Sequence, residues 1–276
     1  MLTRHLSKKL NVSFGQKITR IENKEGQWYL FALTQQSSRQ PQSVNIKGQL
    51  PSSDVVRPCS EVLIATCQQL VLAMPAEQVS ELLGSDHEAY EHVCNIKSEP
   101  SFVATFVVQN LSAEEIKHLA VYSDSVIAEV SLEHEKVQRE SHGFTVLKLT
   151  TTSKWASVHI DEGNDRAGEL LLQRFKMLVN EPNANVVKQY THRWLYSEYS
   201  QLIPAAYLSF QDNLHIVGDY FNPSHAIKPD QAIAPIVTPL AEGVERAFLS
   251  ASQLTKKLLH DRLVNMSSED SLEAVE

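Results

Sequence analysis

The residues best placed to contact a ligand form a short polar group after an apolar run. Gly218-Asp219-Tyr220 follows directly after the apolar residues 214–217. A glycine and an aspartate at the carboxyl end of a buried strand can hold a polar ligand through a backbone amide and a carboxylate. The same residues also fit a tight turn capped by Asp219, and on residue types alone the turn is favoured. Trp194 could stack on a planar ligand, although a tryptophan in a strand more often belongs to a core.

Several common catalytic and cofactor signatures are absent from the sequence. None of the nine glycines forms a G-x-G pair, so the dinucleotide-binding fingerprint is missing. Residues 163–168 resemble a phosphate-binding loop only loosely, because Glu169 replaces the lysine that such a loop needs. The 11 histidines lack metal-ligand spacing and the three cysteines form no C-x-x-C pair, which argues against a metal site. No G-x-S-x-G segment indicates a serine hydrolase.

The composition excludes two classes of partner. The 33 acidic and 25 basic residues give a net charge of −8, and no segment concentrates basic residues, so we expect no nucleic-acid partner. No run approaches the ~18 apolar residues of a membrane span, so we expect no membrane partner. Three cysteines without a disulfide framework, and a start without the apolar region of a signal peptide, predict a cytoplasmic protein.

The elements that must position these residues indicate a mixed α/β (α+β) fold. Apolar alternation and β-branched residues predict strands over 17–22, 28–32, 70–74, 102–109, 125–132, 143–151, 186–196 and 214–217. Helical spacing predicts helices over 2–10, 76–83, 85–94, 113–119, 163–179 and 240–259. The strand over 70–74 is expected to be buried on both faces, since its residues are all apolar and Pro75 ends it. Residues 35–60 are expected to form an exposed loop.

The helix over 240–259 carries one continuous apolar stripe. Its width predicts that it faces a core. The stripe consists of Leu240, Val244, Ala247, Phe248, Ala251, Leu254, Leu258 and Leu259. The acidic segment that follows is expected to form a frayed tail.

Five short motifs recur here in the order seen in a known enzyme family. They are Ile18-Thr19-Arg20-Ile21 followed by Trp28, then residues 70–76, residues 192–194, residues 216–219 and residues 244–250. In this order the chain resembles the renalase-like, amine-oxidase-type FAD-dependent oxidoreductases, from about its first residue to about residue 262. Each motif is short, and the resemblance depends on their order.

The resemblance implies a two-domain flavoprotein that acts on a small-molecule substrate. Residues 1–75 and 205–262 would form an incomplete FAD/NAD(P)-binding-type domain, residues 76–204 a substrate domain built on a mixed sheet, and residues 263–276 the tail. The chemistry implied is hydride transfer from an amine or a reduced nicotinamide to FAD, and then to oxygen. The resemblance assigns no catalytic residue.

The same resemblance places several residues beside FAD. The backbone of Ile18 would lie near the adenine, and Ala73, Met74 and Pro75 would pass along the cofactor. Gly218 and Asp219 would contact the pyrophosphate and ribityl groups, and Trp194 would lie near the ring system. Val244 would be the first residue of the last segment that contacts the cofactor, residues 244–250, at the start of the long helix.

The chain departs from the family pattern at two places. The family begins with a glycine-rich βαβ unit that these 276 residues do not contain, and Arg246 and Ala251 stand where the family has glycines. We therefore expect a truncated or split enzyme that binds FAD weakly or not at all by itself, and that a separate N-terminal glycine-rich chain would complete. The alternative is a non-catalytic binding module that has lost the cofactor.

Overall fold

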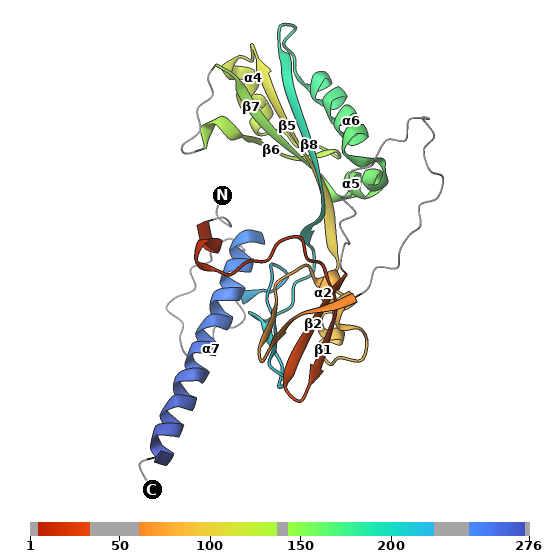
Figure 1. Cartoon of the computed structure of the whole chain (residues 1–276). Coiled ribbons are helices and arrows are strands. Elements are labelled where there is room, and N and C mark those ends of the chain that lie inside the picture. The colour runs from red at the N-terminus through yellow and green to blue at the C-terminus, as the bar shows by residue number, and fades with distance from the viewer. Residues whose placement is uncertain (1–4, 34–60, 137–142, 224–242, 274–276) are drawn as a thin grey trace, which may run out of the picture.

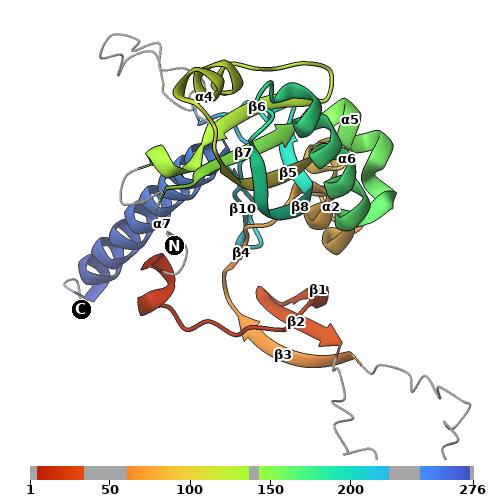
Figure 2. The same cartoon turned by 90° about the horizontal axis from the view of Figure 1, so that it is seen from above.

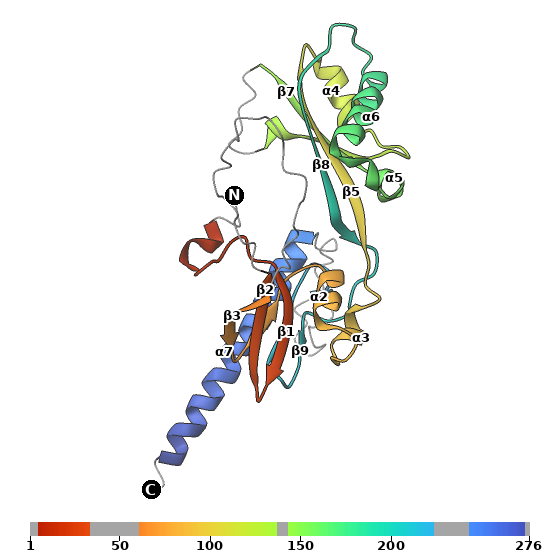
Figure 3. The ribbon, with the colours of Figure 1, turned by 45° about the vertical axis from the view of Figure 1, so that its right-hand side comes forward.

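The computed structural model describes residues 5–33, 61–136, 143–223 and 243–273 of the chain (Figure 1). Within these residues helices and strands are mixed, which confirms the predicted fold class. The two longest strands, β5 (Ser98–Gln109) and β8 (Asn185–Tyr199), extend from a helix-covered sheet toward the part of the molecule that holds β1, β2 and α2 (Figures 1 and 3). The predicted loop over 35–60 lies outside the described residues.

The first sheet confirms the predicted antiparallel pair near the start of the chain. Strands β1 (Ile18–Lys24) and β2 (Gln27–Leu33) pair antiparallel, and Glu25 and Gly26 join them with φ of 54° and 78°. A two-residue turn with both residues in the left-handed region suits the twist of a hairpin. A third strand, β3 (Glu61–Cys67), pairs with β2 and was not predicted, although its β-branched residues are typical of a strand.

The second sheet brings together two apolar runs that lie far apart in the sequence. Strand β10 (Leu214–Ile216) pairs parallel with β4 (Leu70–Leu72) and antiparallel with β9 (Leu208–Ser209). Both runs were predicted as strands, and β4 is shorter than expected. Val71 is 42% exposed, so β4 is not buried on both faces as the sequence indicated.

The third sheet has the strand order β6-β7-β5-β8, and all of its pairings are antiparallel. Its remaining strands are β6 (Ile127–Leu132) and β7 (Thr145–Thr151). The family resemblance implied a mixed sheet here, but mixed pairing occurs in the β4-β10-β9 sheet instead. Three helices pack against it: α4 (Ala113–Ala120), α5 (Ser153–His159) and α6 (Gly163–Leu178) (Figures 1 and 2). Helix α5 was not predicted, although Thr152 caps it by accepting a hydrogen bond from the Trp155 amide.

Two separate clusters of buried apolar side chains stabilise these sheets. The antiparallel-sheet core lies between the third sheet and its helices and consists of Phe102, Ala104, Phe106, Val108, Leu119, Ile127, Val130, Leu147, Leu149, Ala156, Ala167, Leu171 and Phe175. The parallel-strand core surrounds β4 and β10 and consists of Trp28, Leu70, Leu72, Ala76, Val79, Ala89, Val93, Ile96, Tyr199, Leu214, Ile216, Tyr220 and Phe221. Alternate residues of β5 enter the first cluster, as expected for a strand with one covered face.

The remaining helices match the sequence in part. Helix α2 (Ala76–Leu83) has the predicted bounds, whereas the helix predicted over 85–94 reduces to α3 (Tyr90–Val93) within the residues described. Of the helix predicted over 2–10, residues 2–4 lie outside the described residues, His5 and Leu6 are helical, and a 3-10 turn, η1 (Ser7–Lys9), follows them. There are two further 3-10 turns, η2 (Glu133–Glu135) and η3 (Ile160–Glu162). Turn η2 directly follows β6, and η3 joins α5 to α6. None of the helices in the described residues is long and apolar enough to cross a membrane.

The long helix α7 (Gly243–Glu273) corrects two expectations. It continues through most of the segment that the sequence indicated as a frayed tail. Its predicted apolar stripe does not face a core along its length, because Val244, Phe248 and Leu259 are 58–73% exposed. Its middle packs closely, where Ser250 and Leu254 are buried, and Leu240 of the predicted stripe lies outside the described residues.

Candidate functional site

A small cavity lies where the two parallel strands β4 and β10 end. Because the strands are parallel, their carboxyl ends meet at the same edge of the sheet, which is where α/β folds commonly bind ligands. The cavity measures ≈ 280 Å³. Its lining residues are Ala73, Met74, Pro75, Tyr196, Tyr199, Val217, Gly218, Asp219, Ala247 and Ala251. Figure 2 shows β4 and β10 side by side below the third sheet.

Asp219 supplies the carboxylate of this cavity. Burial raises the pKa of Asp219, while its own backbone amide and the nearby Arg246 guanidinium act in the opposite direction. The Arg246 Nε donates a hydrogen bond of 2.7 Å to the backbone carbonyl of Asp219. This contact fixes the backbone at the end of β10 and leaves the carboxylate to face the cavity as a hydrogen-bond acceptor.

Close packing, not an unusual backbone dihedral, requires a glycine at position 218. A Cβ atom at this position would lie 2.3 Å from Cε1 of Tyr220, so the fully buried Tyr220 ring occupies the space that a side chain would need. The Gly218 amide donates a hydrogen bond of 3.3 Å to Oγ of Ser250, which attaches the end of β10 to α7. The sequence therefore requires glycine here for close packing, whatever the cavity holds.

Tyr199 forms an ordered part of the cavity wall. Its hydroxyl accepts a hydrogen bond of 3.1 Å from the Ala76 amide, the first of α2, and donates to Oε2 of Glu77 at 3.4 Å. The other oxygen of Glu77 accepts hydrogen bonds from the amide and hydroxyl of Ser98. Burial raises the pKa of Tyr199, so its phenol stays protonated at neutral pH. Tyr199 can donate or accept a hydrogen bond, but it cannot act as a base.

The structure brings five of the eight predicted site residues together. Ala73, Met74, Pro75, Gly218 and Asp219 line one cavity, as their positions at two strand ends would suggest. Their predicted roles toward a cofactor remain predictions.

The other three predicted residues lie elsewhere. Ile18 is the first residue of β1 and pairs with Ala32. Trp194 is half exposed on β8, with its ring 4.6 Å from that of His192, and Val244 is 73% exposed near the start of α7. None of the three lines the cavity.

Sequence reasoning missed the two tyrosines of the cavity wall. Tyr196 and Tyr199 lie at the end of β8, beyond or at the limit of the strand predicted over 186–196. Their signal is weak, since a tyrosine near a strand end is common in any sheet. Arg246 and Ala251 were noted as replacements of expected glycines, and Ala251 also as part of the apolar stripe, but neither was predicted to lie at the site. The structure shows that Arg246 contacts the Asp219 backbone and that Ala251 lines the cavity.

The arrangement provides binding groups rather than a catalytic constellation. The cavity offers one carboxylate, two phenols and a wall of small apolar side chains, which suits a hydroxylated or otherwise hydrogen-bonding group. Across the described ranges, no group of three histidine, cysteine or acidic side chains is placed to hold a metal ion.

Comparison with known proteins shows the fold. No protein-family model matches the chain, and no curated protein matches it. Among solved structures, an Exiguobacterium sp. 255-15 protein described as a protoporphyrinogen oxidase matches 80% of this chain, with a TM-score of 0.57 and 11% identity. An oxidoreductase from Methanosarcina mazei matches 88%, with a TM-score of 0.51 and 11% identity. The cyclohexylamine oxidase of Brevibacterium oxydans IH-35A matches 74%, with a TM-score of 0.45 and 12% identity.

The matched structures are about twice as long as this chain. It spans 46%, 49% and 42% of their respective lengths. At such low identity the likeness shows that this chain is folded like part of these structures, and it assigns no activity.

Proposed function

We propose that this chain is one part of an FAD-dependent oxidoreductase of amine-oxidase type, resembling renalase. Residues 1–75 and 205–262 would form the incomplete FAD-binding domain and residues 76–204 the substrate domain. The overall reaction would be oxidation of a small amine or reduced nicotinamide by FAD, with oxygen as the final acceptor. The observation that supports this proposal best is the parallel pair β4–β10, with Gly218 and Asp219 at its carboxyl edge.

The described residues fit only part of FAD. Asp219 could accept hydrogen bonds from ribityl hydroxyls, and Ala247 and Ala251 leave room beside it. However, ligand sites usually measure about 300–1,000 Å³, and a cavity of ≈ 280 Å³ cannot enclose a dinucleotide. The chain also has no glycine-rich loop for a pyrophosphate. We therefore derive no catalytic step through the cofactor.

A partner would supply the missing contacts. We propose a glycine-rich βαβ unit, on a separate chain or on a longer form of this one, which would bind beside β4. Among the described residues β4 pairs only with β10, so its other edge has free backbone groups that an added strand can use. The length of the matched structures, about twice that of this chain, supports a missing unit of substantial size.

A second function, a non-catalytic binding module, is favoured by one contact. The Arg246 side chain lies across the end of β10 and donates to the Asp219 carbonyl at 2.7 Å. A long side chain at this point narrows the approach to Asp219, which a cofactor site would keep open. In such a module the cavity would hold a small polar ligand in place of a flavin.

Flavin titration distinguishes the two functions. The purified chain should be colourless and show weak or no FAD binding, whereas the chain joined to an N-terminal glycine-rich unit should bind FAD and show flavin absorbance. In the joined protein, Asp219→Ala should weaken FAD binding roughly 5- to 150-fold, because it removes a hydrogen-bond acceptor for the ribityl chain. Asp161→Ala, in the exposed turn η3, is the matched control and should leave the affinity unchanged.

Three outcomes would contradict parts of this proposal. Submicromolar FAD binding by the 276-residue chain alone would remove the need for a partner. A well-folded joined protein that binds no FAD would favour the binding module. An unchanged FAD dissociation constant in Asp219→Ala, together with a lower melting temperature, would assign Asp219 to the turn alone.

A further inference from the structure

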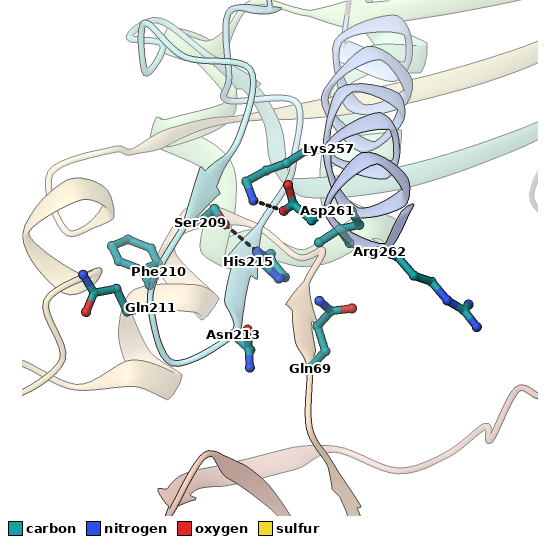
Figure 4. Close-up of a pocket in the computed structure, with 10 residues that line it drawn as sticks. Gln69, Ser209, Phe210, Gln211, Asn213, His215, Lys257, Asp261 and Arg262 are labelled. Carbon is teal, nitrogen blue, oxygen red and sulfur yellow. Dashed lines mark hydrogen bonds and ion pairs between the residues drawn. The ribbon is translucent and has the colours of Figure 1, made fainter. Parts of the chain in front are cut away.

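A second and larger cavity lies at the opposite end of the same two strands. It measures ≈ 570 Å³ and is lined by residues from three segments. Gln69 and Asn213 immediately precede β4 and β10, whereas Gly218 and Asp219 of the first site follow β10. The opposite wall is α7, through Lys257, Leu258, Asp261 and Arg262 (Figure 4). The two cavities are therefore distinct sites.

His215 is the unusual residue of this second cavity. It lies in the middle of β10 and is 97% buried, with a relative exposure of 3%. Its Nδ1 lies 2.9 Å from Oγ of Ser209, the residue directly opposite on β9. Its Nε2 is buried and has no hydrogen-bond partner among the residues that the structure describes. His215 lines the cavity, and a buried polar atom without a partner on such a side chain calls for an explanation, for which a bound ligand is one candidate.

Burial and three charged side chains act on His215. Lys257 lies close enough to disfavour protonation of the imidazole, and it forms an ion pair with Asp261 one turn further along α7. Asp212 and Asp261 act in the opposite direction, but burial and Lys257 prevail and lower the pKa of His215. The imidazole is thus neutral at neutral pH, and when the Ser209 hydroxyl donates to Nδ1, Nε2 carries the proton and is a donor.

The residues that line the cavity offer an excess of hydrogen-bond donors, and they include two positive side chains, Lys257 and Arg262, and one negative side chain, Asp261. Lys257 and Asp261 neutralise each other, and Arg262 adds a positive charge at the rim, where Figure 4 shows its side chain directed away from His215. The amides of Gln69 and Asn213 can donate from the other side. This set matches a single negative charge better than the double charge of a phosphate.

We propose that this cavity binds the carboxylate of a small organic acid, held between the Lys257 ammonium and Nε2 of His215. Gln69 and Asn213 would contact the rest of the ligand, and Leu258 would pack against its apolar part. The site does not depend on flavin binding, because it lies at the other end of β4 and β10. The chain would then bind a second ligand. Binding of that ligand would link α7 to β10, the strand that Asp219 follows.

The test uses the full chain and benzoate as the probe. Benzoate should shift the ¹⁵N resonance of His215 Nε2 in a saturable way and raise the pKa of His215, because a bound anion favours the imidazolium. Lys257→Gln should weaken benzoate binding about tenfold or more, since it removes a charged hydrogen-bond donor. The matched control is Lys256→Gln, which removes the same charge from an exposed position of α7 outside the cavity and should change binding less than about twofold.

Several results would overturn the proposal. One is the absence of any change at His215 in the wild-type chain at millimolar benzoate, a measurement that does not depend on the folding of a variant. Equal weakening by Lys256→Gln and Lys257→Gln would indicate general electrostatic attraction instead of a site. Stronger binding of inorganic phosphate than of benzoate would reject a monocarboxylate ligand.

Discussion

The two hydrophobic cores of this protein are completed to different extents. The antiparallel-sheet core is closed, because α4, α5 and α6 cover one face of its sheet, and Phe102, Phe106 and Leu147 are fully buried. The parallel-strand core lies beside α7, whose Val244, Phe248, Leu259 and Leu263 are 58–73% exposed. Exposed apolar side chains occur in both regions, but they are arranged differently. In the antiparallel-sheet region they lie on several elements, among them Val121, Val158 and Met177, whereas beside the parallel-strand core they lie along the single helix α7.

Three buried polar atoms lack a hydrogen-bond partner within the described residues. Nε2 of His215 and the hydroxyl of Tyr220 lie beside the parallel-strand core, whereas Nδ1 of His159 lies on α5 in the antiparallel-sheet region, 3.1 Å from Oε1 of Glu162. In the antiparallel-sheet region, Thr151 also accepts a hydrogen bond from the Phe102 amide, and Asp124 binds Arg174 and Tyr122. We therefore expect ligands and a partner to bind at the parallel strands, where the two cavities lie, rather than at the antiparallel sheet.

The largest expected effect tests how complete each core is. Phe106→Ala should destabilise the protein by about 3–5 kcal/mol, because Phe106 is fully buried and stacks on Phe175 with ring centres 4.8 Å apart. Phe248→Ala, on the exposed face of α7, should change the free energy of unfolding by less than about 0.5 kcal/mol. Urea denaturation of both variants measures the difference. Similar losses would show that α7 is already covered in solution.

An intermediate effect is expected at the end of β10. Gly218→Ala should destabilise the chain by about 1–3 kcal/mol, because the new Cβ would collide with the Tyr220 ring. Gly243→Ala is the matched control at the start of α7. There the added Cβ meets Asp219 Oδ2 at 3.4 Å, an ordinary contact, so the control should be neutral or stabilising by up to about 1 kcal/mol. A neutral Gly218→Ala would mean that Tyr220 can move and that this region is loosely packed.

The smallest effect concerns the polar network of the closed region. Burial opposes ionisation of Asp124, but hydrogen bonds from the Ile127 amide, Arg174, the Val126 amide and Tyr122 outweigh it and lower the pKa of Asp124 to about 2. Asp124→Asn should therefore cost about 1 kcal/mol at neutral pH.

The pH dependence checks the sign of this effect. Because the folded pKa lies below the unfolded value of about 3.9, the stabilisation by Asp124 is complete above pH 5 and is lost as the pH falls toward 2. Melting temperatures of the wild-type chain and Asp124→Asn should converge over this range. A difference that persists unchanged at pH 2 would exclude the ionised carboxylate as its source.

Much of the local structure followed from the sequence because it depends on neighbouring residues. The Glu25-Gly26 turn, the apolar alternation of β5 and the bounds of α2 were predictable from turn chemistry and periodicity. Strand β3 and helix α5 were missed. Strand β3 has no fully buried residue to give it a strong pattern, and α5 is a short helix that begins at a single threonine cap.

The sequence by itself determined that the chain folds as mixed helices and strands, that it lacks a glycine-rich dinucleotide loop, and that Gly218 and Asp219 end a buried strand. Only the tertiary structure decided which residues share a cavity with them. Tyr199 reaches Asp219 because β8 ends beside α2, and Lys257 reaches His215 because α7 packs across β10. Side chains 20 or more residues apart meet through the packing of whole elements, and no spacing along the chain encodes such a contact.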